Sequence, residues 1–215
     1  WELLELEPEG DVIEHVEVRE QRVLLEHGIH VALMRRQVDD LVFRNYNTDN
    51  SALLGNSITA FCEDGHGRIW MGTVDGHLNY INMSSPDVIH VPEGYRSDVA
   101  RNIDVVLGMV YDSVNDYIWI MARNGLYIYD IGKSTFAESP VSTSACLGAC
   151  IVSGKLLVSS LEGLRIIDLE NLESRVIDGF PACMSLVPDG DTIWAGTYGN
   201  GIYRVDNCMA EKPDI

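Results

Sequence analysis

Short apolar runs alternate with turns rich in Gly, Asp and Asn along most of this chain. In the clearest stretch, an apolar run at residues 57–62 is followed by the polar segment 63–67 and by a second apolar run at 68–73. The polar segment contains Asp-Gly and Gly-x-Gly, which supply the positive-φ positions that tight hairpins need. Runs of this length, rich in Val, Ile, Tyr and Trp, predict β-strands. We expect a helical turn or two only within residues 99–110.

One motif recurs along the chain: an aromatic or apolar pair, two small residues, and then a Gly followed by another apolar run. It is clearest at residues 69–76 and 193–201, weaker at 118–125 and 156–163, and degenerate at 23–28. The equivalent central positions are 37 to 49 residues apart and are occupied by Trp70, Trp119, Leu157 and Trp194. Four-stranded units that repeat at about 40 residues are typical of β-propeller blades.

The sequence therefore predicts an all-β fold, a β-propeller of about five four-stranded blades that occupies residues 1–215 as a single domain or a propeller fragment. The blades are expected at residues 12–46, 57–92, 104–140, 147–178 and 182–206. The fifth blade lacks a fourth strand, which residues 1–6 could supply from the opposite end of the chain. That pairing would close a five-blade ring and remove unpaired sheet edges. The alternative is an arc of a larger, seven-bladed propeller, and the sequence leaves both open.

The chain of 215 residues is acidic, with 33 Asp and Glu against 15 Lys and Arg and a formal net charge of −18. This charge repels a phosphate backbone, so we expect no nucleic-acid partner, whereas neutral or basic ligands are compatible with it. No apolar run reaches the roughly 18 to 20 residues that a membrane span requires. No signal peptide is recognisable, and a chain that begins with Trp1 is expected to be a mature or excised piece.

We expect no metal site, no cofactor and no disulfide framework. The five Cys are an odd number, and Cys146 and Cys150 are accompanied by no second Cys pair or His cluster at zinc spacing. Cys62 and Cys150 fall on expected inner strands, where a free Cys behaves as a small buried hydrophobe. The repeated Trp residues are expected to pack between neighbouring blades. The Asp of each hairpin, such as Asp64 or Asp189, is expected to accept N–H groups of the turn.

Residues 56–73 closely resemble the two-component regulator propeller repeat. They contain its Asn-x-Ile opening, its acidic pair at Glu63-Asp64 with Gly65, and its Ile-Trp-x-Gly-Thr run at 69–73. Segments 125–130 and 201–206 are similar to the tail of that repeat, and residues 43–54 are similar to the linker between its blades. The third and fourth copies match in outline, and the first copy matches by spacing.

Proteins with this repeat are typically periplasmic sensor regions of bacterial hybrid two-component systems, where paired seven-bladed propellers and a sandwich domain precede a membrane span, a kinase and a regulator. The resemblance implies a non-catalytic, periplasmic sensor propeller that detects glycan breakdown products. Its implied partners are an oligosaccharide or other small ligand, propeller or sandwich domains of the same sensor, and a second copy in a homodimer. This chain is too short for one seven-bladed ring and carries no kinase motif, so kinase activity would lie in other parts.

A ligand site on this fold is expected on loops that the rigid blades present. One end of the blades gathers the turns between second and third strands and the blade-to-blade connections, the longest of which contains residues 95–102. Tyr stacking combined with Asn, Asp and Arg hydrogen bonding suits a carbohydrate or an anionic sugar, and it is also an ordinary loop composition. No catalytic residue is expected. The candidate ligand-binding residues are Asp75, His77, Tyr95, Arg96, Arg101, Asn102, Arg123, Asn124, Tyr198 and Asn200.

Two other function classes stay open. A propeller enzyme of the lyase or glycoside hydrolase type would use carboxylates or a His near the central channel. Residues 63–70 are faintly similar to phrases of streptogramin-lyase-like propellers and to the Asp-box of sialidases, but no Gly-x-Ser-x-Gly elbow, His-Glu-x-x-His or phosphate loop appears. The third class is a scaffold that binds other proteins through a propeller face.

Overall fold

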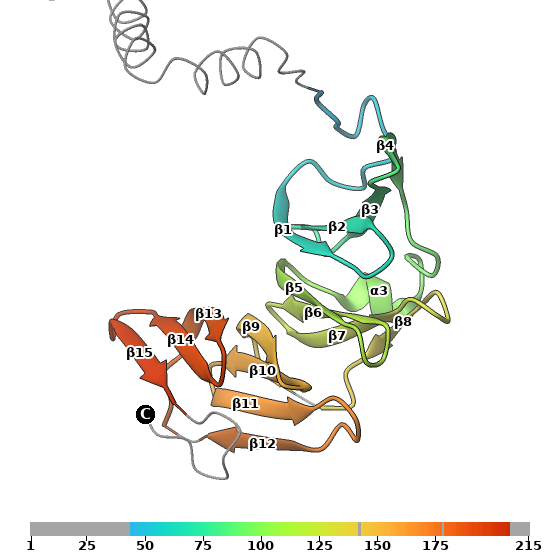
Figure 1. Cartoon of the computed structure of the whole chain (residues 1–215). Coiled ribbons are helices and arrows are strands. Elements are labelled where there is room, and N and C mark those ends of the chain that lie inside the picture. The colour runs from blue at the N-terminus through green and yellow to red at the C-terminus, as the bar shows by residue number, and fades with distance from the viewer. Residues whose placement is uncertain (1–43, 142, 178, 207–215) are drawn as a thin grey trace, which may run out of the picture. The chain divides into compact units, whose positions relative to one another are not determined.

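The computed structural model describes residues 44–141, 143–177 and 179–206 (Figure 1). The predicted first blade at 12–46, apart from its last residues, and the candidate closing strand at 1–6 lie outside this part of the chain. The described residues form strands joined by tight turns, together with one short helix, α3 (Asp98–Asn102). The strands are β1 (Ile58–Glu63), β2 (Arg68–Thr73), β3 (Leu78–Asn82), β4 (Ser85–His90), β5 (Val106–Asp112), β6 (Tyr117–Ala122), β7 (Gly125–Asp130), β8 (Thr135–Glu138), β9 (Cys146–Val152), β10 (Lys155–Ser160), β11 (Gly163–Asp168), β12 (Ser174–Ile177), β13 (Cys183–Asp189), β14 (Thr192–Thr197) and β15 (Ile202–Val205).

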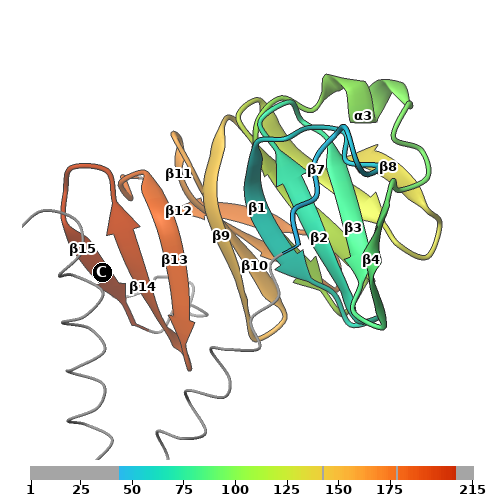
Figure 2. The ribbon, with the colours of Figure 1, turned by 90° about the horizontal axis from the view of Figure 1, so that it is seen from above.

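The strands are arranged in sheets in which consecutive strands pair antiparallel. Within the described residues, β1–β4, β5–β8 and β9–β12 form four-stranded sheets, and β13–β15 form a three-stranded sheet. The first strand of each sheet contacts the first strand of the next, so β1, β5, β9 and β13 follow one another side by side (Figures 1 and 2). These sheets are propeller blades, and the predicted all-β propeller fold is confirmed. The closed five-blade ring and the arc of a larger propeller both stay predictions.

Adjacent blades are held together by apolar side chains that face the next blade. Trp70 of β2 is 0% exposed and packs with Val106 and other residues of β5–β8. Trp119 of β6 is also 0% exposed and packs against Leu156 and its neighbours in β9–β12. Both Trp residues thus lie between blades as predicted. Trp194 does not follow the prediction: it is 38% exposed, because no sheet follows β13–β15 within the described residues.

A buried carboxylate holds the hairpin between β1 and β2. Asp64 accepts hydrogen bonds from the Trp70 indole Nε1 at 2.7 Å and from the Arg68 Nε at 2.6 Å. It also accepts the backbone N–H groups of His66 at 2.8 Å and of Arg68 at 3.0 Å. Burial by itself raises the pKa of Asp64, but these hydrogen bonds outweigh it and hold the pKa below its usual value. The group is therefore a structural anion and not a proton donor.

The same arrangement recurs in the hairpin between β5 and β6. Asp112 accepts a hydrogen bond from the Trp119 indole at 3.2 Å and from the backbone N–H of Val114 at 2.8 Å. The matching residue of the last described blade, Asp189, is exposed. The prediction that these Asp residues accept turn N–H groups is therefore confirmed for Asp64 and Asp112.

The longest connection between blades carries α3. The Ser97 hydroxyl caps the helix by accepting the backbone N–H of Ala100 at 3.2 Å. The helix lies beside β8, the outer strand of its blade (Figure 1). Ala100 and Ile103 are buried in the same apolar cluster as Phe136. The helical turn expected within residues 99–110 thus begins one residue earlier, at Asp98.

Candidate functional site

Two of the predicted site residues meet at the end of the second described blade. The side-chain amide of Asn124, in the β6–β7 turn, donates to the Asn102 carbonyl at 2.6 Å and to the Tyr127 hydroxyl at 2.9 Å. The amide of Asn102 donates to the same hydroxyl at 3.2 Å. Asn124 also accepts the backbone N–H of Asp104 at 3.1 Å. This network joins α3 to the β6–β7 turn and fixes the hydroxyl of Tyr127, a residue that the sequence analysis did not select.

Arg123, the neighbour of Asn124, extends this network. Its guanidinium makes two bonds to the carboxylate of Asp104, at 2.7 and 3.0 Å. This bond pair is the largest cause of a pKa of Asp104 below its usual value. Since Arg123 is engaged with Asp104, it positions the connection after α3.

The remaining predicted residues lie in other turns. Asp75 and His77 lie in the β2–β3 turn, where Gly76 is so close to the carbonyl of Ile103 that an added Cβ would overlap it. Tyr198 and Asn200 lie in the β14–β15 turn of the last described blade, where Tyr198 is strongly exposed.

Tyr95, Arg96 and Arg101 make contacts within their own segment, 95–102. The Arg96 guanidinium stacks over the Tyr95 ring at 5.0 Å, and Tyr95 packs against the blade core. Arg101 forms an exposed ion pair with Asp98 at 3.7 Å. The ten predicted residues are therefore not gathered into one constellation, and Asn102 and Asn124 are the pair that the structure joins.

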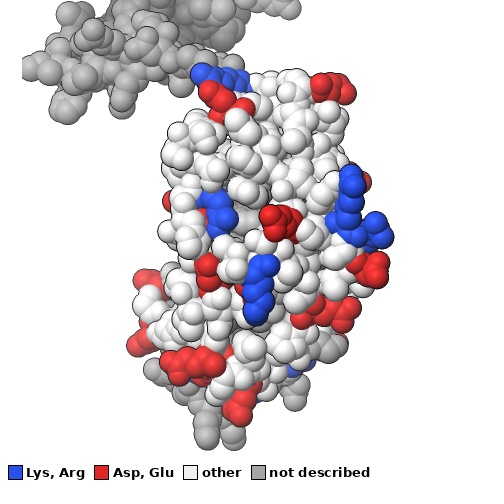
Figure 3. Space-filling view, turned by 90° about the vertical axis from the view of Figure 1, so that its right-hand side faces the viewer, with Lys and Arg blue, Asp and Glu red and all other residues white. Residues whose placement is uncertain are grey.

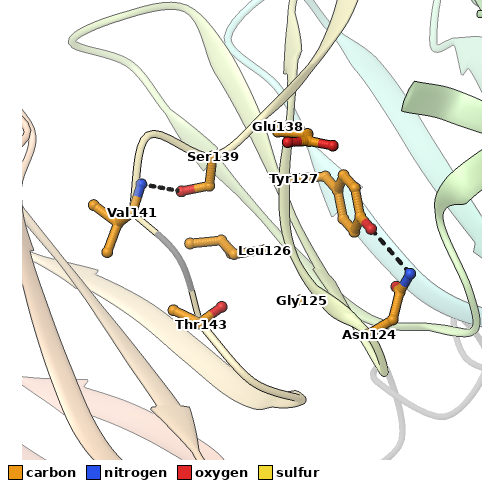
Figure 4. A pocket seen from close by; sticks show the side chains of 8 residues that line it. All are labelled: Asn124, Gly125, Leu126, Tyr127, Glu138, Ser139, Val141 and Thr143. Atoms are coloured by element: carbon orange, nitrogen blue, oxygen red, sulfur yellow. Dashed lines mark hydrogen bonds between the residues drawn. The ribbon is translucent and has the colours of Figure 1, made fainter. Parts of the chain in front are cut away.

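A pocket opens beside this network, at the junction between blade β5–β8 and the connection that leads to β9 (Figure 4). Its volume is about 220 Å³. Side chains from β7 and β8 form one wall, where Tyr127 and Glu138 are cross-strand partners. The segment after β8 forms the other wall, where the Ser139 hydroxyl accepts the backbone N–H of Val141 at 3.1 Å. The lining residues are Asn124, Gly125, Leu126, Tyr127, Glu138, Ser139, Val141 and Thr143.

A glycine keeps the floor of this pocket open. Gly125 has φ +149°, and an added Cβ would lie 3.5 Å from the Thr143 carbonyl, which is ordinary contact distance. The matching residue of the next blade, Gly163, has φ +126°, but its added Cβ would lie 2.7 Å from the Ile177 carbonyl. The Gly163 junction is therefore closed by backbone, whereas the Gly125 junction has room for a ligand group.

The pocket offers hydrogen-bonding groups and one negative charge. Glu138 is exposed, the Ser139 hydroxyl can donate, and Asn124 presents an amide oxygen. The Tyr127 ring is buried, and burial is the largest cause of a pKa above its usual value, so its hydroxyl stays protonated at neutral pH. A buried ring offers no stacking face, and recognition here would depend on hydrogen bonds. On the face seen in Figure 3, acidic and basic side chains are interspersed.

Of the residues that line the pocket, Asn124 was predicted from the sequence and the others were not. Tyr127 falls in an apolar strand run, so it was assigned to the repeat tail and not to a site. Glu138 and Ser139 end β8 and begin a connection without any motif. The sequence signal that could have indicated this site is the Asn124-Gly125 pair at the start of β7. There a polar turn residue is followed directly by a residue without a side chain.

A second polar cluster lies at the opposite ends of the strands. The His66 ring nitrogen Nε2 is 2.8 Å from the Asp116 carboxylate, and the Tyr111 hydroxyl donates to the same oxygen at 3.1 Å. These residues join the β1–β2 hairpin to the β5–β6 hairpin. This contact links the two blades and has a structural role.

Two further observations concern the described residues. They contain no group of three or more His, Cys, Asp or Glu side chains placed to hold a metal ion. Among them there is also no helix with the length and apolar character needed to cross a membrane.

Comparison with protein families finds one match. The model described as two component regulator propeller matches residues 52–75, which include β1, β2 and the start of the turn after β2. Comparison with curated proteins finds no match. The repeat resemblance seen in the sequence is thus supported in the blade where it is strongest.

Comparison with solved structures finds extracellular domains of bacterial signalling proteins. One, from B. thetaiotaomicron, is described as the extracellular domain of a hybrid two component system, BT4673; the TM-score is 0.61 at 17% identity, over 74% of this chain and 22% of that one. A second, BT3049 of the same organism and with the same description, gives 0.62 at 16% identity, over 80% and 26%. The computationally designed Ika4 protein gives 0.54 at 15% identity, over 75% and 98%.

These identities are low, and the likeness shows a shared fold. This chain spans about a quarter of the length of the two extracellular domains, whereas it matches nearly the whole of the designed protein. The described fold is thus similar to part of two much larger extracellular domains and to nearly the whole of a small designed protein.

Proposed function

We propose that this chain is a non-catalytic, extracytoplasmic sensor propeller of a two-component signalling protein, periplasmic in location, which binds a small polar ligand beside Gly125. The observation that carries the proposal is the pocket of about 220 Å³ bordered by Asn124, Tyr127 and Glu138. The repeat match at residues 52–75 and the likeness to extracellular domains of two component systems support the sensor role.

A neutral saccharide is the ligand class that this pocket favours. Sugar hydroxyls can donate to the Glu138 carboxylate, a charge-assisted hydrogen bond, and can accept from the Ser139 hydroxyl. The same carboxylate and the net charge of −18 oppose an anionic sugar. The volume is below the roughly 300 Å³ at which drug-sized pockets begin, so one sugar unit would be held at a time.

The position of the pocket gives binding a route to conformational change. Its walls come from the β6–β7 turn and β7–β8 on one side and from the connection to β9 on the other. A ligand that bridges them stabilises one placement of these segments. Signalling requires that the ligand bind two states of the sensor unequally. The parts that carry a signal across a membrane and the kinase would lie outside the described residues.

Isothermal titration of the full chain with a panel of neutral mono- and disaccharides tests this proposal. Glu138→Gln keeps the shape of the side chain and removes its charge, so we expect it to weaken binding roughly 10- to 100-fold. Tyr127→Phe is expected to weaken it less, because the hydroxyl acts mainly by holding Asn124.

The matched control is Glu170→Gln, an exposed carboxylate on the connection between β11 and β12, which should leave the affinity unchanged. Binding that Glu138→Gln leaves intact would move the site elsewhere on the propeller. Turnover of a glycan in the same titrations would contradict the non-catalytic role.

A further inference from the structure

Each pair of described neighbouring blades is joined by the same rows of side chains. Successive rows of cross-strand partners face opposite sides of a sheet. Every second row on the first three strands of a blade therefore faces the next blade. In the third sheet these partners are Cys150, Leu157 and Ile166, and all three are buried in a cluster shared with β13–β15. The matching rows of the first two sheets contain Trp70 and Trp119, which are buried in the same way. We call this side of a sheet its leading face.

The leading face of β13–β15 carries the same residue types without a cover. Its matching partners are Val187, Trp194 and Arg204. Val187 and Trp194 are exposed, and Ile202, which matches the fully buried Leu164 of the preceding sheet, is 69% exposed. Apolar residues at the matching positions of the preceding described blades are buried, or partly buried like Cys62 and Val110. This face is therefore built for a blade.

The opposite side of a sheet, its trailing face, receives the preceding blade. On this side the first strands of the second and fourth sheets place Met109 and Leu186, both buried. The matching residue of the first described sheet is Phe61, which is 65% exposed. Next to it, Met71 is buried by Leu53. Both faces thus carry exposed apolar residues at positions of the repeated interface: Trp194 and Ile202 on the leading face and Phe61 on the trailing face.

We propose that copies of this chain associate head to tail, with the leading face of β13–β15 of one copy packed on the trailing face of β1–β4 of the next. The two faces are different, so the contact is heterologous. The occupant of each face is a second copy, because both halves of an interface that already forms three times within the described residues are present on the one chain. Trp194 and Ile202 become buried against Phe61 in this contact.

Sedimentation velocity of the full chain over a concentration series tests the proposal. The wild-type chain self-associates, and Ile202→Asp or Phe61→Asp, each at an exposed position, weakens the association at least about tenfold. The matched control is Val114→Asp in the β5–β6 turn, an aliphatic residue that is 56% exposed and lies on neither face. This control associates like the wild type, and circular dichroism confirms that all three variants are folded.

Mixing the two variants tests the head-to-tail geometry. Ile202→Asp retains an intact trailing face and Phe61→Asp retains an intact leading face, so an equimolar mixture associates more strongly than either variant does alone. A wild-type chain that stays monomeric at every concentration overturns the proposal. Acrylamide quenching of Trp194 fluorescence then shows whether another part of the same chain covers this face, and that outcome overturns the proposal as well. Association that survives Ile202→Asp, or a mixture that stays monomeric, overturns it as well.

Discussion

Replacing Asp64 by Ala is expected to destabilise the fold more than any exposed substitution of the same type. The carboxylate side chain is fully buried, and four donors point at it: the Trp70 indole, the Arg68 guanidinium and two backbone N–H groups. An unpaired buried donor costs about 1–3 kcal/mol. Arg68 is partly exposed and can regain water, so the loss in the free energy of unfolding stays below the sum over four unpaired donors. We expect a loss of about 3–5 kcal/mol, which is typical when one partner of a buried ion pair is removed.

Urea denaturation followed by circular dichroism measures this loss at pH 7. The matched control is Asp189→Ala, at the equivalent but exposed position of the last described blade, which should change the free energy of unfolding by less than about 0.5 kcal/mol. If the free energies of unfolding of the two variants differ by less than about 1 kcal/mol, the Asp64 carboxylate does not stabilise the hairpin, and the reasoning is refuted.

The effect of Asp64→Ala should also depend on pH in a defined direction. The pKa of Asp64 is lowered in the folded state, so its stabilisation is complete above the unfolded value of about 3.9 and is lost as the pH falls through the folded value. The stability gap between wild type and Asp64→Ala should therefore narrow only below about pH 4. A gap that narrows near neutral pH would contradict the assignment.

Three further outcomes are expected. Leu164→Ala, at a fully buried position between blades, should cost about 2–5 kcal/mol in urea unfolding, whereas Leu161→Ala, 70% exposed, should cost less than about 0.5 kcal/mol. In thermal melts Gly163→Ala should lower the melting temperature more than Gly125→Ala, because the Cβ added at 163 would overlap the Ile177 carbonyl at 2.7 Å, whereas the Cβ added at 125 lies at an ordinary contact distance of 3.5 Å from the Thr143 carbonyl. Gly125→Ala should still weaken saccharide binding, because the added methyl group enters the pocket. Burial raises the pKa of Cys62 to about 11, so this thiol should react slowly with iodoacetamide at pH 8 in the folded protein and quickly after unfolding. Peptide mapping measures the extent of the reaction.

The strands and their grouping were predictable because each hairpin carries its own local signals. Asp-Gly and Gly-x-Gly turns separate apolar runs whose length fits a strand, and the repeated motif, with Trp in three of four copies, recurs every 37 to 49 residues. The exposure of Trp194 was not predictable, since a repeated residue is buried only where a neighbour covers it. The sequence of β14 resembles that of β2, but its surroundings differ.

The candidate site was only partly predictable, for a different reason. Asn124 was selected because it lies in a polar turn, which is visible in the sequence. The pocket depends on where the chain runs between β8 and β9 and on the space that it leaves beside Gly125. At Gly163 a very similar turn is closed by the Ile177 carbonyl. That difference lies in the path of the connecting backbone and has no local sequence signal.

The most direct test of the proposed sensor site is to map, by amide chemical shifts of the full chain, where a neutral saccharide that binds in titration is held. The account predicts that the largest shifts fall on Asn124, Gly125 and Ser139, at the two walls of the pocket. Shifts that are confined to the β14–β15 turn at Tyr198 and Asn200, or that are absent at saturating saccharide, would contradict it.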